Sequence, residues 1–180
     1  MRMQSIIRAI YPTQCVACDA PTEDDFGLCG ACWRETQFIS GTICGKCGTS
    51  LPGDSQADDL LCDDCLTIAR PWDRGRSVLA YSGVGRKLVL SLKHGDRTDL
   101  AQPAARWMAR VAAPLLAEDT LSGAITANPK RKALIAGGHI LLVDDVMTSG
   151  ATLAASAEAC FVAGAREVNV LTLARVVKDD

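Results

Sequence analysis

Apolar residues in the second half of the chain form two kinds of pattern. A short continuous apolar run is typical of a buried strand, and one occupies residues 140–143; the mainly apolar residues 77–81 and 168–173 are also strand-like. Apolar residues at three- and four-residue steps are typical of amphipathic helices, and they occur at residues 85–93 and 99–116, followed by an alanine-rich helical stretch at 150–163. The last helix joins two expected strands, which predicts a right-handed parallel unit. The second half therefore predicts an α/β fold built on a parallel sheet.

Cysteines, rather than apolar periodicity, mark the first half. The chain has nine cysteines, and eight of them form four pairs with the same two-residue spacer: Cys15/Cys18, Cys29/Cys32, Cys44/Cys47 and Cys62/Cys65. This spacer lets both thiolates of a tight turn, called a knuckle below, face one ion, and Zn²⁺ takes four sulfurs from two knuckles. The four knuckles predict one or two structural zinc sites.

Several ways of using these cysteines fit the sequence. Chain order favours one site from the first two knuckles and one from the last two, whereas interleaved pairing or a single occupied site would use the same residues. Disulfides and a thioredoxin-like redox pair are the alternatives to zinc. We expect no secretory signal, since Arg2 and Arg8 surround only a brief apolar core, and this disfavours disulfides. A redox motif needs only one such pair.

The two halves meet near Arg70-Pro71-Trp72, after which the cysteines stop until Cys160. We therefore expect a small zinc-ribbon domain at residues 1–70 and an α/β domain at 71–180. Ile6, Ile7 and Ile10 predict a short docking helix at the start of the ribbon. Because about 60 residues of this composition bury little apolar area, we expect metal to hold the ribbon together.

Charge limits the classes of partner. The 180 residues carry a formal charge of -2, but the first 75 contain 6 Lys/Arg against 11 Asp/Glu. Thiolates around zinc would make that half more acidic still. We therefore expect a protein-docking ribbon and no direct binding of nucleic acid. No apolar run approaches the ~20 residues of a membrane span, so we expect a cytoplasmic protein.

Candidate chemistry gathers after the apolar run 140–143. Asp144 and Asp145 follow it, and a loop with hydroxyls and Gly150 then leads into a helix. Ligands bind at this edge of parallel sheets. Amides of residues 148–152 at the helix N-terminus favour a phosphate, while the two carboxylates could accept ribose hydroxyls or help to hold Mg²⁺ on a polyphosphate. The pattern predicts a phosphorylated ribose as ligand.

Three other interpretations apply to segments of this kind. Two acids before a helix can be a purely structural N-cap. A response-regulator receiver also carries paired acids after a strand, but only 35 residues follow Asp145, too few to complete that domain. The Walker A pattern requires Gly-Lys-Ser/Thr and is absent.

These residues resemble a known family. Asp144-Asp145 through Thr152 is similar to the phosphoribosyl pyrophosphate (PRPP) signature of type I phosphoribosyltransferases. The four knuckles, Pro71-Trp72-Asp73 and Lys93-His94-Gly95-Asp96 together resemble the ComF family, in which a zinc ribbon precedes a phosphoribosyltransferase-like domain. The resemblance implies that Asp144 and Asp145 are catalytic and hold the ribose hydroxyls. It also implies that Lys93 contacts pyrophosphate, the alternative being a solvated lysine at the C-terminal end of its helix. It also implies that the 5′-phosphate is cradled by Met147, Thr148, Ser149, Gly150, Ala151 and Thr152.

The resemblance further implies Mg²⁺ with PRPP, a place in natural competence and DNA uptake, and a protein partner in the uptake machinery. One departure bears on activity. Family members carry a long segment between the helix at 99–116 and the strand at 140, whereas only about 23 residues separate Leu116 from Ile140 here. With three expected strands where such a sheet needs about five, we expect an incomplete sheet and little or no transferase activity. The alternative is a catalytically inactive zinc-ribbon interaction module or a degenerate remnant of the family.

Overall fold

The computed structural model describes residues 12–55, 57, 59–95, 97–118, 120–123 and 132–177. The docking helix expected around Ile6–Ile10 lies outside these residues. Among the described helices, none combines the length and apolar character needed to cross a membrane.

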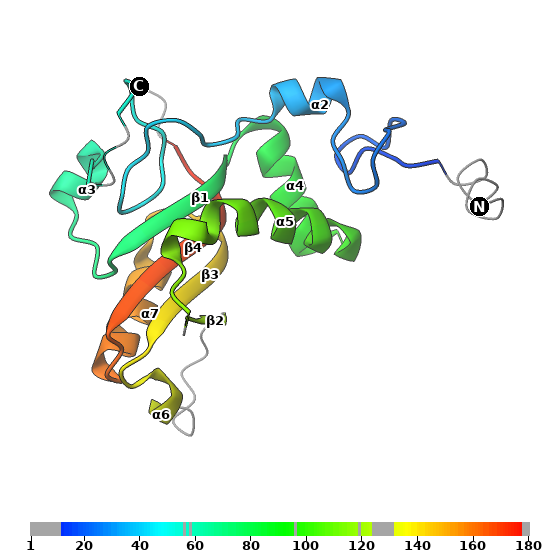
Figure 1. The fold of residues 1–180 in the computed structure, drawn as a ribbon. Coiled ribbons are helices and arrows are strands. Elements are labelled where there is room, and N and C mark those ends of the chain that lie inside the picture. The colour runs from blue at the N-terminus through cyan, green and yellow to red at the C-terminus, as the bar shows by residue number, and fades with distance from the viewer. Residues whose placement is uncertain are drawn as a thin grey trace.

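A four-stranded sheet forms the centre of the molecule (Figure 1). Its strands are β1 (Arg74–Ala80), β2 (Leu121–Gly123), β3 (His139–Met147) and β4 (Glu167–Arg175), in the order β1-β4-β3-β2. All neighbouring strands run parallel. Three of them correspond to the expected runs, and the parallel unit formed by β3, α7 and β4 is confirmed. The sequence missed β2, because three residues are too few to produce a pattern.

Helices cover both faces of the sheet. On one side lie α4 (Gly83–His94) and α5 (Ala101–Ala112), the latter extended by short 3₁₀ turns at Thr98–Leu100 and Ala113–Leu115. On the other lies α7 (Ala151–Val162), and a short α6 (Lys132–Ile135) precedes β3. Adjacent residues of β4 show the two faces: Leu171 packs with Met108 of α5, whereas Val170 packs with Leu153 of α7.

The cysteine-rich part consists of two ribbons, the first at residues 14–35 and the second at 43–67, and both have the same local structure. Each begins with a hairpin turn closed by an isolated antiparallel bridge, Gln14 with Pro21 in the first and Ile43 with Ser50 in the second. Each then reaches a short helix, α2 (Gly30–Glu35) or α3 (Asp63–Thr67). Since the N-cap residues are Cys29 and Cys62, the second knuckle of each ribbon is the first turn of a helix.

The ribbons pack on the α/β part rather than standing apart from it. Cys15 and Cys32 share an apolar cluster with Leu79 of β1 and helix α4, while Cys44 and Cys47 share another with β3, β4 and α7. In Figure 1 the ribbon helices α2 and α3 lie on the β1 side of the sheet, with α2 beside α4. Apolar burial therefore helps to hold the ribbons, in addition to any metal.

Ribbon backbone also pairs with the outer side of β1. The amide of Ala80 donates to the carbonyl of Gln37 at 2.9 Å, and the amide of Ile39 donates to the carbonyl of Val78 at 2.8 Å. Further along β1, the amide of Gly75 donates to the carbonyl of Gly45 at 2.9 Å. The strand at the border of the sheet is thus lined by both ribbons.

Candidate functional site

The eight paired cysteines come together in two clusters. The first consists of Cys15, Cys18, Cys29 and Cys32, and the second of Cys44, Cys47, Cys62 and Cys65; the four sulfurs of each lie within 4.8 Å of one another. The cysteines are therefore grouped in chain order, with the first two knuckles in one cluster and the last two in the other, as the sequence favoured. All nine cysteines are among the described residues and are free thiols, so the structure contains no disulfide between them.

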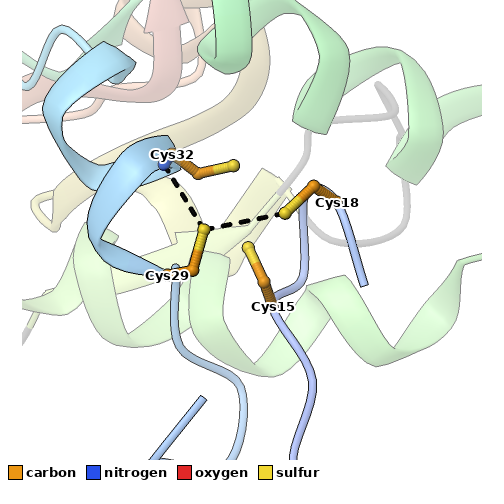
Figure 2. Close-up of side chains that lie close together, drawn as sticks. All are labelled: Cys15, Cys18, Cys29 and Cys32. Atoms are coloured by element: carbon orange, nitrogen blue, oxygen red, sulfur yellow. Dashed lines mark hydrogen bonds between the residues drawn. The ribbon is translucent and has the colours of Figure 1, made fainter. Parts of the chain in front are cut away.

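Figure 2 shows the first cluster, in which two sulfurs come from the hairpin and two from the start of α2. The Sγ atoms of Cys18 and Cys29 lie 3.6 Å apart, and the amide of Cys32 donates to Cys29 Sγ at 3.5 Å. In the second cluster, Cys47 Sγ and Cys62 Sγ are likewise 3.6 Å apart. Sulfurs at the usual Zn–S distance of about 2.3 Å around one tetrahedral ion are about 3.8 Å apart. Donor type and spacing are consistent with structural zinc in both clusters.

Acidity is uneven within the clusters. In the second cluster, a side-chain hydrogen bond with Cys47 lowers the pKa of Cys44 to about 4, and the same contact raises the pKa of Cys47. In the first, burial acts to raise the pKa of Cys15, but backbone hydrogen bonds, among them one from Cys29, outweigh it and lower the pKa to about 6. One thiolate thus forms easily in each cluster, while the raised pKa values of Cys32 in the first and of Cys47 and Cys65 in the second oppose further charge. A divalent cation would remove that resistance.

The two clusters differ in exposure. Cys44 and Cys47 are fully buried under Trp72 and the sheet, whereas Cys18 is exposed to solvent. Gly48, directly after Cys47, takes a positive φ of 70° as the tight turn requires. The second cluster is therefore the more enclosed of the two, although the first also contains two buried cysteines, Cys15 and Cys32.

The loop between β3 and α7 encloses a small hollow at the carboxyl edge of the sheet. Its volume is about 40 Å³, several times the ~10–15 Å³ that one water molecule requires. It is lined by Asp144, Val146, Met147, Thr148, Ser149, Gly150, Ala151, Thr152 and Leu153. The six residues that the resemblance assigned to a phosphate cradle all lie here. The side chain of Met147 belongs to the apolar core, so Met147 offers its backbone alone.

Asp144 and Asp145 lie within β3 rather than after it, because the strand continues to Met147. Adjacent strand positions point to opposite sides, and only Asp144 is among the residues that line the hollow. Burial raises the pKa of Asp144, the charge of Asp145 raises it further, and a 2.8 Å hydrogen bond from the Asp145 amide acts in the opposite direction. Asp145 instead faces α4, where its Oδ2 lies 3.3 Å from Nζ of Lys93. The structure thus brings Lys93 to the second carboxylate, Asp145, and not into the lining of the hollow.

Two arginines that the sequence did not single out donate hydrogen bonds to backbone carbonyls of the loop between β3 and α7. Arg70 Nη1 donates to the carbonyl of Ser149, and Arg175 Nη1 donates to the carbonyls of Thr148 and Met147. Arg175 ends β4 and is only 4% exposed. No periodicity could have revealed either residue, since the contact between Arg70 and Ser149 spans 79 positions of chain.

The cysteine-rich part of the chain matches a known domain. Residues 6–66 match the family model described as "Double zinc ribbon domain". This agrees with the two cysteine clusters and with the hairpin-and-helix design that each ribbon repeats.

Curated relatives match over nearly the whole chain. The chain is 25% identical over 229 residues to the DNA utilization protein YhgH of Escherichia coli (strain K12), with 92% of this chain and 98% of the relative covered. The YhgH proteins of Shigella flexneri and Escherichia coli O157:H7 match with the same identity and coverage. The aligned length exceeds the 180 residues present here, so the relatives contain residues without a counterpart in this chain. No solved structure matches significantly. The chain is thus similar to a double zinc ribbon at residues 6–66 and to the DNA utilization protein YhgH over most of its length.

Proposed function

We propose that this chain is a ComF-like zinc-ribbon protein that binds the 5-phosphoribosyl group of PRPP or ribose 5-phosphate at the loop between β3 and α7. The observation that carries the proposal is the hollow at the carboxyl edge of β3, which Asp144 and the first turn of α7 line together. Amides at the N-terminus of a 12-residue helix favour an anion. A carboxylate at the adjacent strand end suits the vicinal hydroxyls of a ribose.

The electrostatics around the hollow support an anionic ligand. Arg70 and Arg175 place two guanidinium groups directly behind the loop, and Lys93 lies beside Asp145. These three cations offset the two adjacent carboxylates, which would otherwise repel a phosphate. In this proposal Asp144 accepts the ribose hydroxyls, while Asp145 holds Lys93 at the side where pyrophosphate would extend.

We further propose that binding is not followed by efficient transfer of the phosphoribosyl group. Transfer needs groups that position the nitrogen nucleophile, and the relatives contain residues that this shorter chain does not have. The described part of the sheet has four strands, one of them only three residues long. The chain would then act by binding, in a process such as the DNA utilization for which its relatives are named.

One observation favours the second candidate, an interaction module without a phosphoribosyl ligand. Both ribbon helices present large apolar side chains to solvent: Trp33 on α2 is 51% exposed and Leu66 on α3 is 67% exposed. Exposed apolar side chains mark protein contacts where they form a contiguous patch, so this candidate requires Trp33 or Leu66 to belong to one. In this alternative the ribbon recruits a partner of the DNA-uptake machinery and the loop is only structural.

Calorimetric titration of the zinc-loaded protein with ribose 5-phosphate, and with PRPP plus Mg²⁺, separates the two candidates. We expect wild-type protein to release heat with both ligands and Asp145→Asn to bind more weakly, because Lys93 loses its charged partner. Asp99→Asn is the matched control, since Asp99 pairs with Arg97 away from the loop. Absence of heat from the wild type with either ligand would leave only the interaction module.

A further inference from the structure

Arg70 and Arg175 contact both the loop between β3 and α7, called the phosphate loop below, and the surroundings of the second cysteine cluster. Arg175 Nη2 lies 3.9 Å from Oδ2 of Asp64, the residue directly before Cys65. Arg70 reaches the same cluster through Trp72, because its guanidinium lies over the Trp72 ring and the indole nitrogen donates to Lys46, between Cys44 and Cys47. Arg175 therefore connects the loop carbonyls with helix α3, which carries two cysteines of the cluster at its start, and Arg70 connects them with the knuckle of Cys44 and Cys47.

Carbonyl contacts of this kind determine which way the loop amides point. In a planar trans peptide the C=O and the following N–H point in opposite directions, and the described residues contain no cis peptide. Arg70 binds the Ser149 carbonyl, so the amide of Gly150 is directed away from Arg70. Arg175 binds the Thr148 carbonyl and turns the amide of Ser149 in the same manner. The two guanidinium groups thus orient the amides that face an incoming phosphate.

The packing leaves these side chains little freedom. A Cβ at Gly150 would lie 2.6 Å from Arg70 Nη1 and 3.1 Å from Cη2 of Trp72, and the Arg70 guanidinium lies 5.5 Å from the Trp72 ring centroid. Trp72 in turn donates from its indole nitrogen to the carbonyl of Lys46, between Cys44 and Cys47, at 2.6 Å. The loop, the arginine pair and the second cluster therefore form one continuous set of contacts.

We propose that Arg70 and Arg175 are positioning residues through which the second cysteine cluster holds the phosphate loop in its binding conformation. Metal in the second cluster then supports ligand binding at the loop, whereas metal in the first cluster does not. The ligand part of this inference rests on the proposed function, but the conformation of the loop can be measured without any ligand.

The test uses amide NMR signals of the full zinc-loaded protein, with ribose 5-phosphate as the probe. In the wild type we expect the Ser149 and Gly150 amide signals to move on titration. We expect Arg70→Gln and Asp64→Asn to shift both signals before any ligand is added and to weaken binding about tenfold, with Arg70→Lys recovering part of the affinity. Arg74→Lys is the control. Arg74 is the first residue of β1, and its side chain donates to the carbonyl of Pro114 rather than to the loop or α3.

Metal dependence is tested by serine substitution of one cysteine in each cluster. Cys62→Ser should move the Ser149 and Gly150 signals as Arg70→Gln does, whereas Cys18→Ser should leave them in place. Unchanged loop signals in Asp64→Asn and Arg70→Gln would overturn the inference, and they do so even if Cys62→Ser fails to fold. If the wild type gives loop signals that respond to the variants but not to ribose 5-phosphate, the proposed ligand is wrong and the positioning role stands.

Discussion

Gly48 and Ser77 bring the second ribbon and β1 into backbone contact. A Cβ built on Gly48 would lie 2.5 Å from the backbone nitrogen of Ser77 and 2.8 Å from the carbonyl carbon of Arg76. Gly48 also has a φ of 70°. Two separate reasons, conformation and space, therefore require glycine after the third knuckle.

Gly48→Ala should destabilise the zinc-loaded protein more than Gly41→Ala does. Gly41 has a similar φ of 75° but open space where a Cβ would lie, so its substitution isolates the conformational part, about 1–2 kcal/mol. The backbone clash at Gly48 should add about 1–3 kcal/mol. Urea unfolding monitored by tryptophan fluorescence measures both. Equal losses for the two variants would mean that β1 and the ribbon can move apart without penalty.

Zinc should leave the two clusters at different rates. Cys18 is exposed, while Cys44 and Cys47 are fully buried, so a chelator reaches the first cluster more easily. We expect zinc release to a chromogenic chelator in two phases, each of about one zinc per chain. Cys18→Ser should abolish the faster phase and retain the slower one. A single phase for the wild type, or loss of the slower phase in Cys18→Ser, would contradict this assignment.

Asp144→Asn should stabilise the protein at pH 7. Burial raises the pKa of Asp144 in the folded state, so the folded protein resists losing that proton and stability falls as pH rises through the folded pKa. Asparagine removes the penalty and can still accept the hydrogen bond from the Asp145 amide. The gain should shrink as pH falls through the folded pKa toward the lower unfolded pKa, over the range in which zinc stays bound.

Asp99→Asn is the control of opposite sign for this pH dependence. A hydrogen bond with Arg97 lowers the pKa of Asp99, so its carboxylate contributes stability that is present above the unfolded pKa and lost as pH falls through the folded pKa. Denaturation curves at several pH values compare the two variants. A loss of stability at pH 7 in Asp144→Asn would show that the carboxylate is needed for folding rather than kept for a ligand.

Trp72→Phe should lower the free energy of unfolding by about 1–3 kcal/mol, because the Lys46 carbonyl loses the hydrogen bond from the fully buried Trp72 indole. Trp33→Phe offers a matched comparison, since Trp33 is half exposed and packs on Phe38 at a centroid distance of 4.5 Å, a contact that phenylalanine can keep. Thermal unfolding followed by circular dichroism measures both. Similar stabilities for the two variants would contradict the role given to Trp72 between the second ribbon and the loop.

The parts of this molecule that sequence could predict are those that depend on neighbours along the chain. Residues 85–93 and 168–173 carry their own periodicity and became α4 and β4. The two-residue spacers likewise led to the cysteine clusters. The split between Asp144, at the hollow, and Asp145, at Lys93, depends on how far β3 continues, and an apolar run ending at residue 143 does not show that. Arg70 lay in a stretch that looked like a linker, and only tertiary packing brings it to Ser149.

The ribbon backbone along β1 has a consequence for how the chain can be divided. A parallel sheet that ends in an uncovered strand presents unpaired amides and carbonyls that recruit other chains. Residues 37–39 and Gly45 occupy that side of β1 through their hydrogen bonds to Gly75, Val78 and Ala80. A fragment starting at residue 71 would expose this border and self-associate. The ribbons therefore protect the edge of the sheet from pairing with other chains, so we expect the α/β part to stay monomeric only when the ribbons fold with it.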